Sequence, residues 1–147
     1  MKTTKIIVSA QDIGGCNVLI PIINELKTDN LIQLVLLFSD GSCEIAKRNG
    51  LDYIDITKLQ YDELLNLITN ESPNLIFTST STGECCEKII TLIGKELNIK
   101  TVAIIDHGAH YKHRFSDVNT ENLKYTPDYI LVTDQRMKND MIKYGFD

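Results

Sequence analysis

Six apolar runs alternate with segments of helical periodicity, and this alternation constrains the fold more than any other feature of the sequence. The runs are too continuous to be strands with one exposed face, which is typical of strands buried on both faces of a parallel sheet. Between them, apolar residues recur at intervals of three and four, as in helices with one buried face. Short connections with right-handed crossovers then predict a doubly wound, Rossmann-like parallel sheet of about six strands in a three-layer α/β/α fold. The predicted strands cover residues 5–10, 32–39, 51–56, 74–80, 100–106 and 129–133.

Residues that begin and end helices stand at several of the predicted boundaries. Gly50 and Gly145 lie where two helical segments should stop, since glycine readily adopts the conformation that ends a helix. Ser81 precedes Glu84 by three positions, which is the spacing of a capping box at a helix start. The sequence therefore predicts a helix that begins close to Ser81.

Size, charge and cysteine usage restrict the function classes. With 147 residues, 43% of them hydrophobic, the chain is expected to form a single Rossmann-like domain over residues 1–147. The formal net charge is −5 and the charges are interspersed, so no basic stripe indicates a nucleic-acid partner. No stretch approaches the ~20 apolar residues that span a membrane, and the first apolar run is too short for a signal peptide. We expect a cytoplasmic protein whose four cysteines are reduced and lie near helix starts.

Polar segments follow several predicted strands, and ligands bind outside the carboxyl ends of the strands in open α/β sheets. The first segment holds Asp12 and the pair Gly14-Gly15, which would let backbone amides at a helix start approach an anion. The same glycines can serve only as a tight strand-to-helix turn. Between these two interpretations, we expect the pair to start a helix and also to bind an anion. Neither GxGxxG nor GxxxxGK[ST] occurs in the chain, so no established phosphate motif decides between them.

The longest irregular connection runs from His107 to Pro127 and carries all three histidines. Asp106 and His107 end the fifth apolar run, and a carboxylate beside an imidazole can perform acid–base chemistry near neutral pH. The alternative is that Asp106 only caps the following turn. The spacing of His107, His110 and His113 would suit a metal on a helix, but a glycine within an irregular loop argues against helical spacing. We expect this loop to form a mobile wall of the ligand cleft.

Two sets of candidate site residues follow, and neither a metal nor a cofactor is predicted. The candidate catalytic residues are Asp106 and His107. The candidate ligand-binding residues are Asp12, Gly14, Gly15, Asn17, Ser81, Thr82, Gly83, Glu84, His110, Tyr111 and Arg114.

Several segments resemble the N-terminal Rossmann-like domain of GT-B-type sugar enzymes, which include nucleotide-sugar glycosyltransferases and UDP-N-acetylglucosamine 2-epimerases. The resemblance rests on the first strand with its Gly14-Gly15 elbow, TSTSTGECCEK at 78–88, TVAIIDHGAHYKHRF at 101–115 and TPDYILVTDQRMKNDMIKYGFD at 126–147. In such enzymes the N-terminal domain chiefly binds the acceptor or completes the cleft. The C-terminal domain makes most of the contacts with the nucleotide sugar.

The resemblance implies positions for site residues as well as a function. Gly14 and Gly15 match the glycine loop of the family, and the cleft loop would carry Asp106, His107, Tyr111 and Arg114. The chain would then be the acceptor-side half of a glycosyltransferase-like or nucleotide-sugar epimerase-like enzyme. Its ligand would be a sugar or nucleotide sugar, and a partner chain or further domain would supply the other half.

Two alternatives stay open beside this half-enzyme. One is a free-standing domain that binds a phosphate-bearing or sugar-like molecule without catalysis. The other is a small autonomous enzyme that uses Asp106 and His107, with a homodimer closing the cleft. We expect the chain alone to lack appreciable glycosyl transfer or epimerisation.

Overall fold

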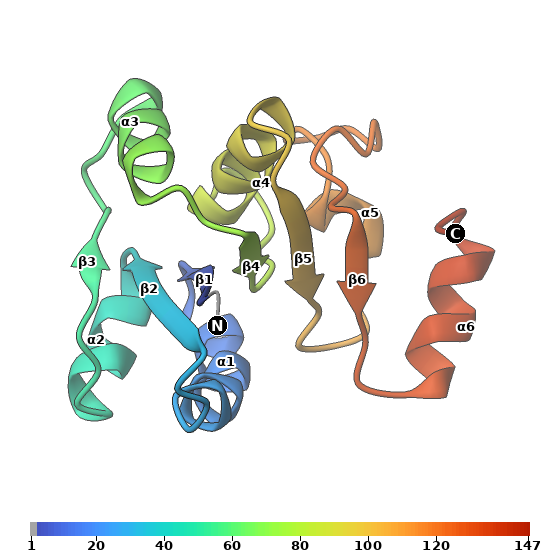
Figure 1. The fold of residues 1–147 in the computed structure, drawn as a ribbon. Helices are drawn as coiled ribbons and strands as arrows, with labels where there is room; N and C mark the ends of the chain where they lie inside the picture. Colours follow the sequence, from blue (N-terminus) through green and yellow to red (C-terminus); the bar gives the residue numbers. More distant parts are fainter. Residues whose placement is uncertain (1–2) are drawn as a thin grey trace.

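All six strands of the sheet run parallel in the computed structural model, which describes residues 3–147. The strand order is β3-β2-β1-β4-β5-β6, so the chain starts near the middle of the sheet, builds to one edge and then to the other (Figure 1). This order confirms the predicted doubly wound, Rossmann-like fold. The strands are β1 (Thr4–Ala10), β2 (Ile32–Phe38), β3 (Ile54–Asp55), β4 (Leu75–Thr78), β5 (Lys100–Ile104) and β6 (Tyr129–Leu131).

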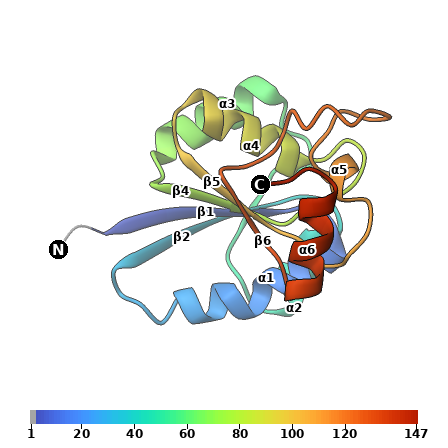
Figure 2. The ribbon, with the colours of Figure 1, turned by 90° about the vertical axis from the view of Figure 1, so that its right-hand side faces the viewer.

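Helices cover both faces of the sheet and give three layers (Figure 2). Apolar side chains of α1 and α2 pack on one face, and those of α3 and α4 pack on the other. Helix α6 lies beside β6 at the edge of the sheet (Figure 1), where a third apolar cluster joins it to the segment after β5. The helices are α1 (Ile13–Leu26), α2 (Gly41–Arg48), α3 (Tyr61–Glu71), α4 (Cys86–Glu96), α5 (Tyr111–Arg114) and α6 (Gln135–Lys143).

The continuous apolar runs have the physical cause that the sequence indicated. Neighbouring residues Ile7 and Val8 of β1 are both fully buried, and each packs against a different layer of helices. The edge strand β3 is shorter than the predicted 51–56. The amide of Leu51 still donates to the carbonyl of Ala46 in α2, so the chain joins the sheet only at residues 54–55.

Two helix ends follow the prediction and one helix start does not. Gly50 and Gly145 have φ angles of +63° and +91° just after α2 and α6, which confirms them as helix terminators. Helix α4 begins at Cys86, so the predicted capping box of Ser81 with Glu84 is wrong. The Ser81 hydroxyl contacts side chains from other parts of the fold instead.

All four cysteines are buried free thiols at the starts of helices, as predicted. Burial raises the pKa of Cys16 to about 11 and raises the pKa of Cys86 well above its ordinary value. Thiols of this kind stay protonated near neutral pH and pack as small apolar groups. Within residues 3–147, no helix is both long enough and apolar enough to cross a bilayer.

Candidate functional site

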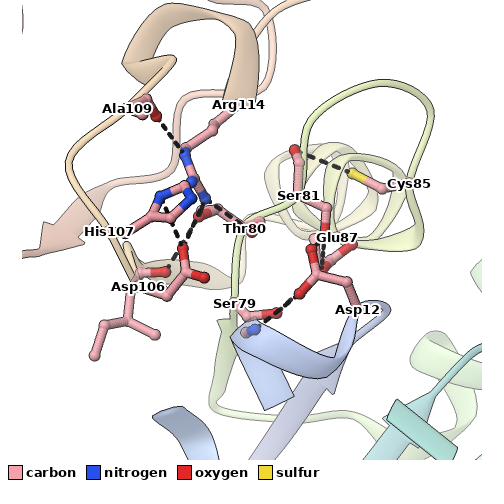
Figure 3. A network of polar contacts seen from close by, with 12 residues as sticks. Asp12, Ser79, Thr80, Ser81, Cys85, Glu87, Asp106, His107, Ala109 and Arg114 are labelled. Atoms are coloured by element: carbon pink, nitrogen blue, oxygen red, sulfur yellow. Dashed lines mark hydrogen bonds and ion pairs between the residues drawn. The ribbon is translucent and has the colours of Figure 1, made fainter. Parts of the chain in front are cut away.

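The strand order reverses between β1 and β4, and the segments that follow β1, β4 and β5 converge at their carboxyl ends (Figure 3). In Rossmann-like sheets the crevice at such a reversal is where ligands bind. The convergence rests on direct contacts, because a side chain after β1 bonds to one after β4 and a guanidinium joins β4 to β5. The residues that come together at this edge form what we call the switch-point cluster, which consists of Asp12, Ser79, Thr80, Ser81, Glu87, Asp106, His107 and Arg114.

Asp12 both caps helix α1 and holds the segment after β4. Its Oδ1 accepts a hydrogen bond from the Gly15 amide at 2.8 Å, as an N-cap residue does. Its Oδ2 accepts a hydrogen bond from the Ser81 hydroxyl at 2.8 Å. The predicted helix start at Gly14-Gly15 is therefore confirmed. The amide of Gly15 already donates its hydrogen bond to Asp12, so it is not free to bind an anion.

Glu87 is a member of the cluster that the sequence did not indicate. Its side chain is only 3% exposed, and Oε1 accepts hydrogen bonds from the hydroxyls of Ser79 and Ser81 and from the amide of Gln11 at 2.9–3.1 Å. A buried carboxylate requires such donors. The three-residue spacing from Ser81 favours Glu84, but the later start of α4 places Glu87 in the first turn of the helix.

The Ser81 hydroxyl lies between two carboxylates, at 2.8 Å from Asp12 Oδ2 and 2.9 Å from Glu87 Oε1. A hydroxyl has one hydrogen, so it donates to one carboxylate at a time. With Asp106 nearby, this part of the cluster is rich in hydrogen-bond acceptors and negative charge (Figure 3). It therefore suits the hydroxyl groups of a ligand better than a phosphate group.

Arg114 is the cation of the cluster, and it is only 4% exposed. Its Nη1 donates to the carbonyl and hydroxyl of Thr80 at 3.1 and 2.9 Å and to Asp106 Oδ1 at 2.9 Å. Its Nε donates to the Ala109 carbonyl at 3.0 Å, and Nη2 contacts Nδ1 of His107. Because every nitrogen is engaged within the protein, Arg114 fixes the segment after β5 to β4. Its predicted contact with a ligand stays a prediction.

Arg114 also determines how His107 can act. A guanidinium only donates hydrogen bonds, so Nδ1 of His107 must accept one, and the ring hydrogen then resides on Nε2. Asp106 Oδ1 lies 3.8 Å from Nδ1, beyond hydrogen-bond length, and bonds to Arg114 instead. The predicted pair of Asp106 and His107 is therefore a triad with the arginine between them. The His107 side chain is 64% exposed, so its Nε2–H is accessible as a donor.

The two glycines of the elbow meet different neighbours. A Cβ on Gly15 would lie 2.6 Å from both Cβ and Oγ of Ser79, so α1 can approach β4 only without a side chain there. A Cβ on Gly14 would lie 3.0 Å from Asp106 Oδ2, at the end of a side chain. Gly15 thus has a packing role, whereas Gly14 faces the carboxylate of the candidate catalytic residue.

Several candidate residues lie outside the switch-point cluster. Tyr111 is 7% exposed and packs against Tyr144 with ring centroids 5.6 Å apart, so it belongs to the third apolar cluster. Its neighbours Arg114, Phe115 and Ser116 are buried as well, so the centre of the predicted mobile loop packs against the rest of the fold. The residues Asn17, Thr82 and Glu84 are exposed, and within residues 3–147 their side chains form no hydrogen bond or ion pair with the cluster.

The histidines are not arranged as metal ligands. His110 and His113 pack edge to face with ring centroids 6.2 Å apart, and together with Thr82 and Gly83 they border a hollow of about 230 Å³. Throughout residues 3–147, no three His, Cys, Asp or Glu side chains are grouped so that they could hold a metal ion.

Solved structures of nucleotide-sugar enzymes share this fold. UDP-GlcNAc 2-epimerase from Neisseria meningitidis, bound to UDP-GlcNAc, superposes with a TM-score of 0.74 at 13% identity, over 98% of this chain and 44% of that one. The UDP-GlcNAc 2-epimerase from Methanocaldococcus jannaschii superposes with a TM-score of 0.73 at 14% identity, over 98% of this chain and 43% of that one. MurG from Acinetobacter baumannii superposes with a TM-score of 0.64 at 9% identity, over 92% of this chain and 42% of that one.

These likenesses confirm, at the level of fold, the resemblance that the sequence indicated. The chain spans less than half the length of each of these solved chains. No model of a protein family matches the chain, and no curated protein matches it in sequence. The comparisons therefore show a Rossmann-like fold shared with part of each of these solved chains, and they leave the activity to be argued from the site.

Proposed function

We propose that this chain is the acceptor-side half of a GT-B-like sugar enzyme that transfers a glycosyl group or epimerises a nucleotide sugar. The observation that carries the proposal is the switch-point cluster, where Asp12, Asp106 and His107 meet at the ligand-binding edge of a fold that nucleotide-sugar enzymes share. The acceptor-rich surroundings of Asp12 and Glu87 support recognition of sugar hydroxyls.

The cluster also supports division of the chemistry among its residues. Asp106 has one oxygen held by Arg114, while Oδ2 is directed toward Gly14 at the start of α1. This second oxygen is the candidate general base for a sugar hydroxyl or a ring C–H proton. His107 offers an Nε2–H donor to the same ligand, and Arg114 acts as a positioning residue for both. Gly14 keeps a side chain away from this oxygen.

A second half is part of the proposal, supplied by a further domain, by a partner chain or by a second copy of this chain. The solved chains extend to more than twice the length matched here, which supports a further domain. Exposed apolar side chains on β6 and α6 offer a surface for it; they are Tyr129, Leu131, Ile142 and Tyr144. The four buried free thiols support a reducing location such as the cytoplasm.

Ligand titration of the 147-residue chain, followed by amide NMR shifts, tests the proposal. UDP-GlcNAc and free GlcNAc should shift the amides of Gly14, Ser81 and His107 in a saturable way. Asp106→Asn should weaken this binding about tenfold, and Asp52→Asn, which changes an exposed carboxylate remote from the cluster, should not. Shifts that avoid the cluster, or equal affinity in Asp106→Asn, would contradict the proposed site.

Turnover separates the half-enzyme from its alternatives. The chain alone should bind without converting UDP-GlcNAc, because one half supplies only part of the cleft. Robust epimerisation or glycosyl transfer by the isolated chain would overturn the half-enzyme and favour the autonomous enzyme. Binding that never gains turnover with any candidate second half would favour the non-catalytic binding domain.

A further inference from the structure

A cavity of about 370 Å³ lies between the start of α4 and the segment that follows α5. Small-molecule pockets in proteins begin at about this volume. The residues that border it include Lys88, Ser116 and Tyr125 together with the apolar side chains of Ile89 and Val118. None of the bordering residues belongs to the switch-point cluster, so the cavity is a separate place in the fold.

Lys88 brings an uncompensated positive charge to the cavity wall. The residue is only 5% exposed, and its ammonium donates one hydrogen bond, to the Gly83 carbonyl at 2.6 Å. It also lies 5.8 Å from the ring centroid of Tyr125. The ion pairs formed by residues 3–147 do not include Lys88. Since a buried ammonium without a carboxylate is costly, an anion in the cavity would be stabilised by it.

Ser116 lies in the same wall but is closed to the cavity. Its side chain is fully buried, and its oxygen accepts a hydrogen bond from the amide of Leu123 at 2.9 Å. A ligand in the cavity would therefore meet the ammonium of Lys88 and not this hydroxyl.

The two carboxylates at the cavity do not neutralise Lys88. Asp117 accepts the Tyr125 hydroxyl and the Asn122 amide, each at 2.7 Å, and pairs with Lys124 at 3.6 Å. Glu84 is exposed and has no ion pair within the described residues. The charge of Lys88 is thus left for a group that enters from outside.

We infer that this cavity binds a small organic oxyanion, a carboxylate or a phosphate ester, with its charged end at Lys88 and its apolar part against Ile89, Val118 and Tyr125. The inference goes beyond the proposed sugar site, because every contacting residue differs and the recognised group is a charged oxyanion and not a sugar hydroxyl. It gives the segment after α5 a binding role that does not involve Asp106.

Benzoate and phenyl phosphate are suitable probes, with benzamide as the neutral isostere of benzoate. In amide NMR titrations of the 147-residue chain, the anions should produce saturable shifts at Gly83, Lys88 and Ser116. Benzamide should bind at least about tenfold more weakly. Lys88→Met should lose about tenfold in affinity or more, while Lys95→Met, an exposed lysine on the same helix, should bind like the native chain.

Stability measurements test whether Lys88 only stabilises the fold or also binds the anion. Lys88→Met should melt no lower than the native chain without anion, because it removes a buried unpaired charge, and it should lose the melting-temperature rise that benzoate gives. Equal binding of benzamide and benzoate, native-like affinity in Lys88→Met, or no saturable shift up to about 20 mM would each overturn the inference.

The two proposed sites can fail separately. Asp106→Asn should leave benzoate binding unchanged, and Lys88→Met should leave the binding of free GlcNAc, which carries no charge, unchanged. The variant Glu84→Gln tests whether Glu84 is the counter-ion of Lys88. Anions that bind Glu84→Gln and do not bind the native chain would overturn the inference.

Discussion

Gly15 of α1 lies so close to Ser79 after β4 that a methyl group on the glycine would come within 2.6 Å of the serine Cβ and Oγ. The contact brings the start of the first helix against the end of the neighbouring strand. It also makes the glycine a stability determinant, whatever it contributes to ligand binding.

Gly15→Ala should therefore lower the free energy of unfolding by about 1–3 kcal/mol, as overpacking of a buried contact does. Gly14→Ala is the matched control, because its methyl group would meet only the ends of two side chains, at 3.0 Å from Asp106 Oδ2 and 3.7 Å from Asp12 Oδ1. Urea denaturation of both variants measures the difference. The double variant Gly15→Ala with Ser79→Gly should recover part of the loss, and equal stability of the two alanine variants would contradict the packing role.

Arg114 and His107 should separate into a stability residue and a ligand residue. Arg114→Met leaves the Asp106 carboxylate without its partner and should cost about 2–4 kcal/mol of unfolding free energy, near the range for broken buried ion pairs. His107→Ala removes an exposed ring and should change stability by less than about 0.5 kcal/mol while weakening UDP-GlcNAc binding. A double-mutant cycle between Arg114→Met and Asp106→Asn measures the coupling, which should be clearly above zero.

The contact between Asp128, just before β6, and Thr101 of β5 should make the free energy of unfolding fall in acid. Hydrogen bonds from the backbone and hydroxyl of Thr101 lower the pKa of Asp128 below its ordinary value. A carboxyl whose pKa is lower in the folded state stabilises the fold above its unfolded pKa of about 4, and the contribution is lost as the pH falls through the folded pKa. Asp128→Asn should therefore be less stable than the native chain at pH 6, by under about 1 kcal/mol because the side chain is partly exposed.

Denaturation curves of the two proteins between pH 3 and 7 provide the measurement. The stability difference should be steady at the neutral end and should narrow below about pH 4. A difference that stays constant to the acid end of the range would show that Asp128 does not contribute through its charge.

The four thiols should be slow to react in the folded protein. Burial raises the pKa of Cys16 to about 11 and also raises the pKa values of Cys43, Cys85 and Cys86, so few thiolates form at pH 8. Ellman's reagent should release little colour from the native chain within minutes and about four equivalents in urea. Rapid labelling of any cysteine without denaturant would show that its helix start opens easily.

The fold class was accessible from the sequence because two different periodicities encode it. Continuous apolar runs such as the one around Ile7 and Val8 report burial on both faces, and this burial follows directly from the position of β1 between β2 and β4. The terminators Gly50 and Gly145 were equally accessible, since a positive φ angle favours glycine locally.

The details of the site were less accessible because they depend on contacts between distant residues. Ser81 has the spacing of a cap, but its hydroxyl bonds to Asp12, which is 69 positions away. Arg114 lies on a polar segment that suggests an exposed cation, yet the carbonyl of Thr80 and the carboxylate of Asp106 draw it inward. Glu87 could be recognised as a buried carboxylate only once the start of α4 was known.

The central position of β1 has a consequence for synthesis on the ribosome. β1 pairs with β2 early, but its other edge pairs with Leu75–Thr78 of β4, about half the chain later. Until β4 and α4 have left the ribosomal tunnel, one edge of β1 stays unpaired and the face of Ile7 lacks part of its cover. Such long-range pairing folds slowly and exposes the nascent chain to aggregation. Arg114 is made later still, after β5 and before β6, so the first five strands can pair before the switch-point cluster is complete.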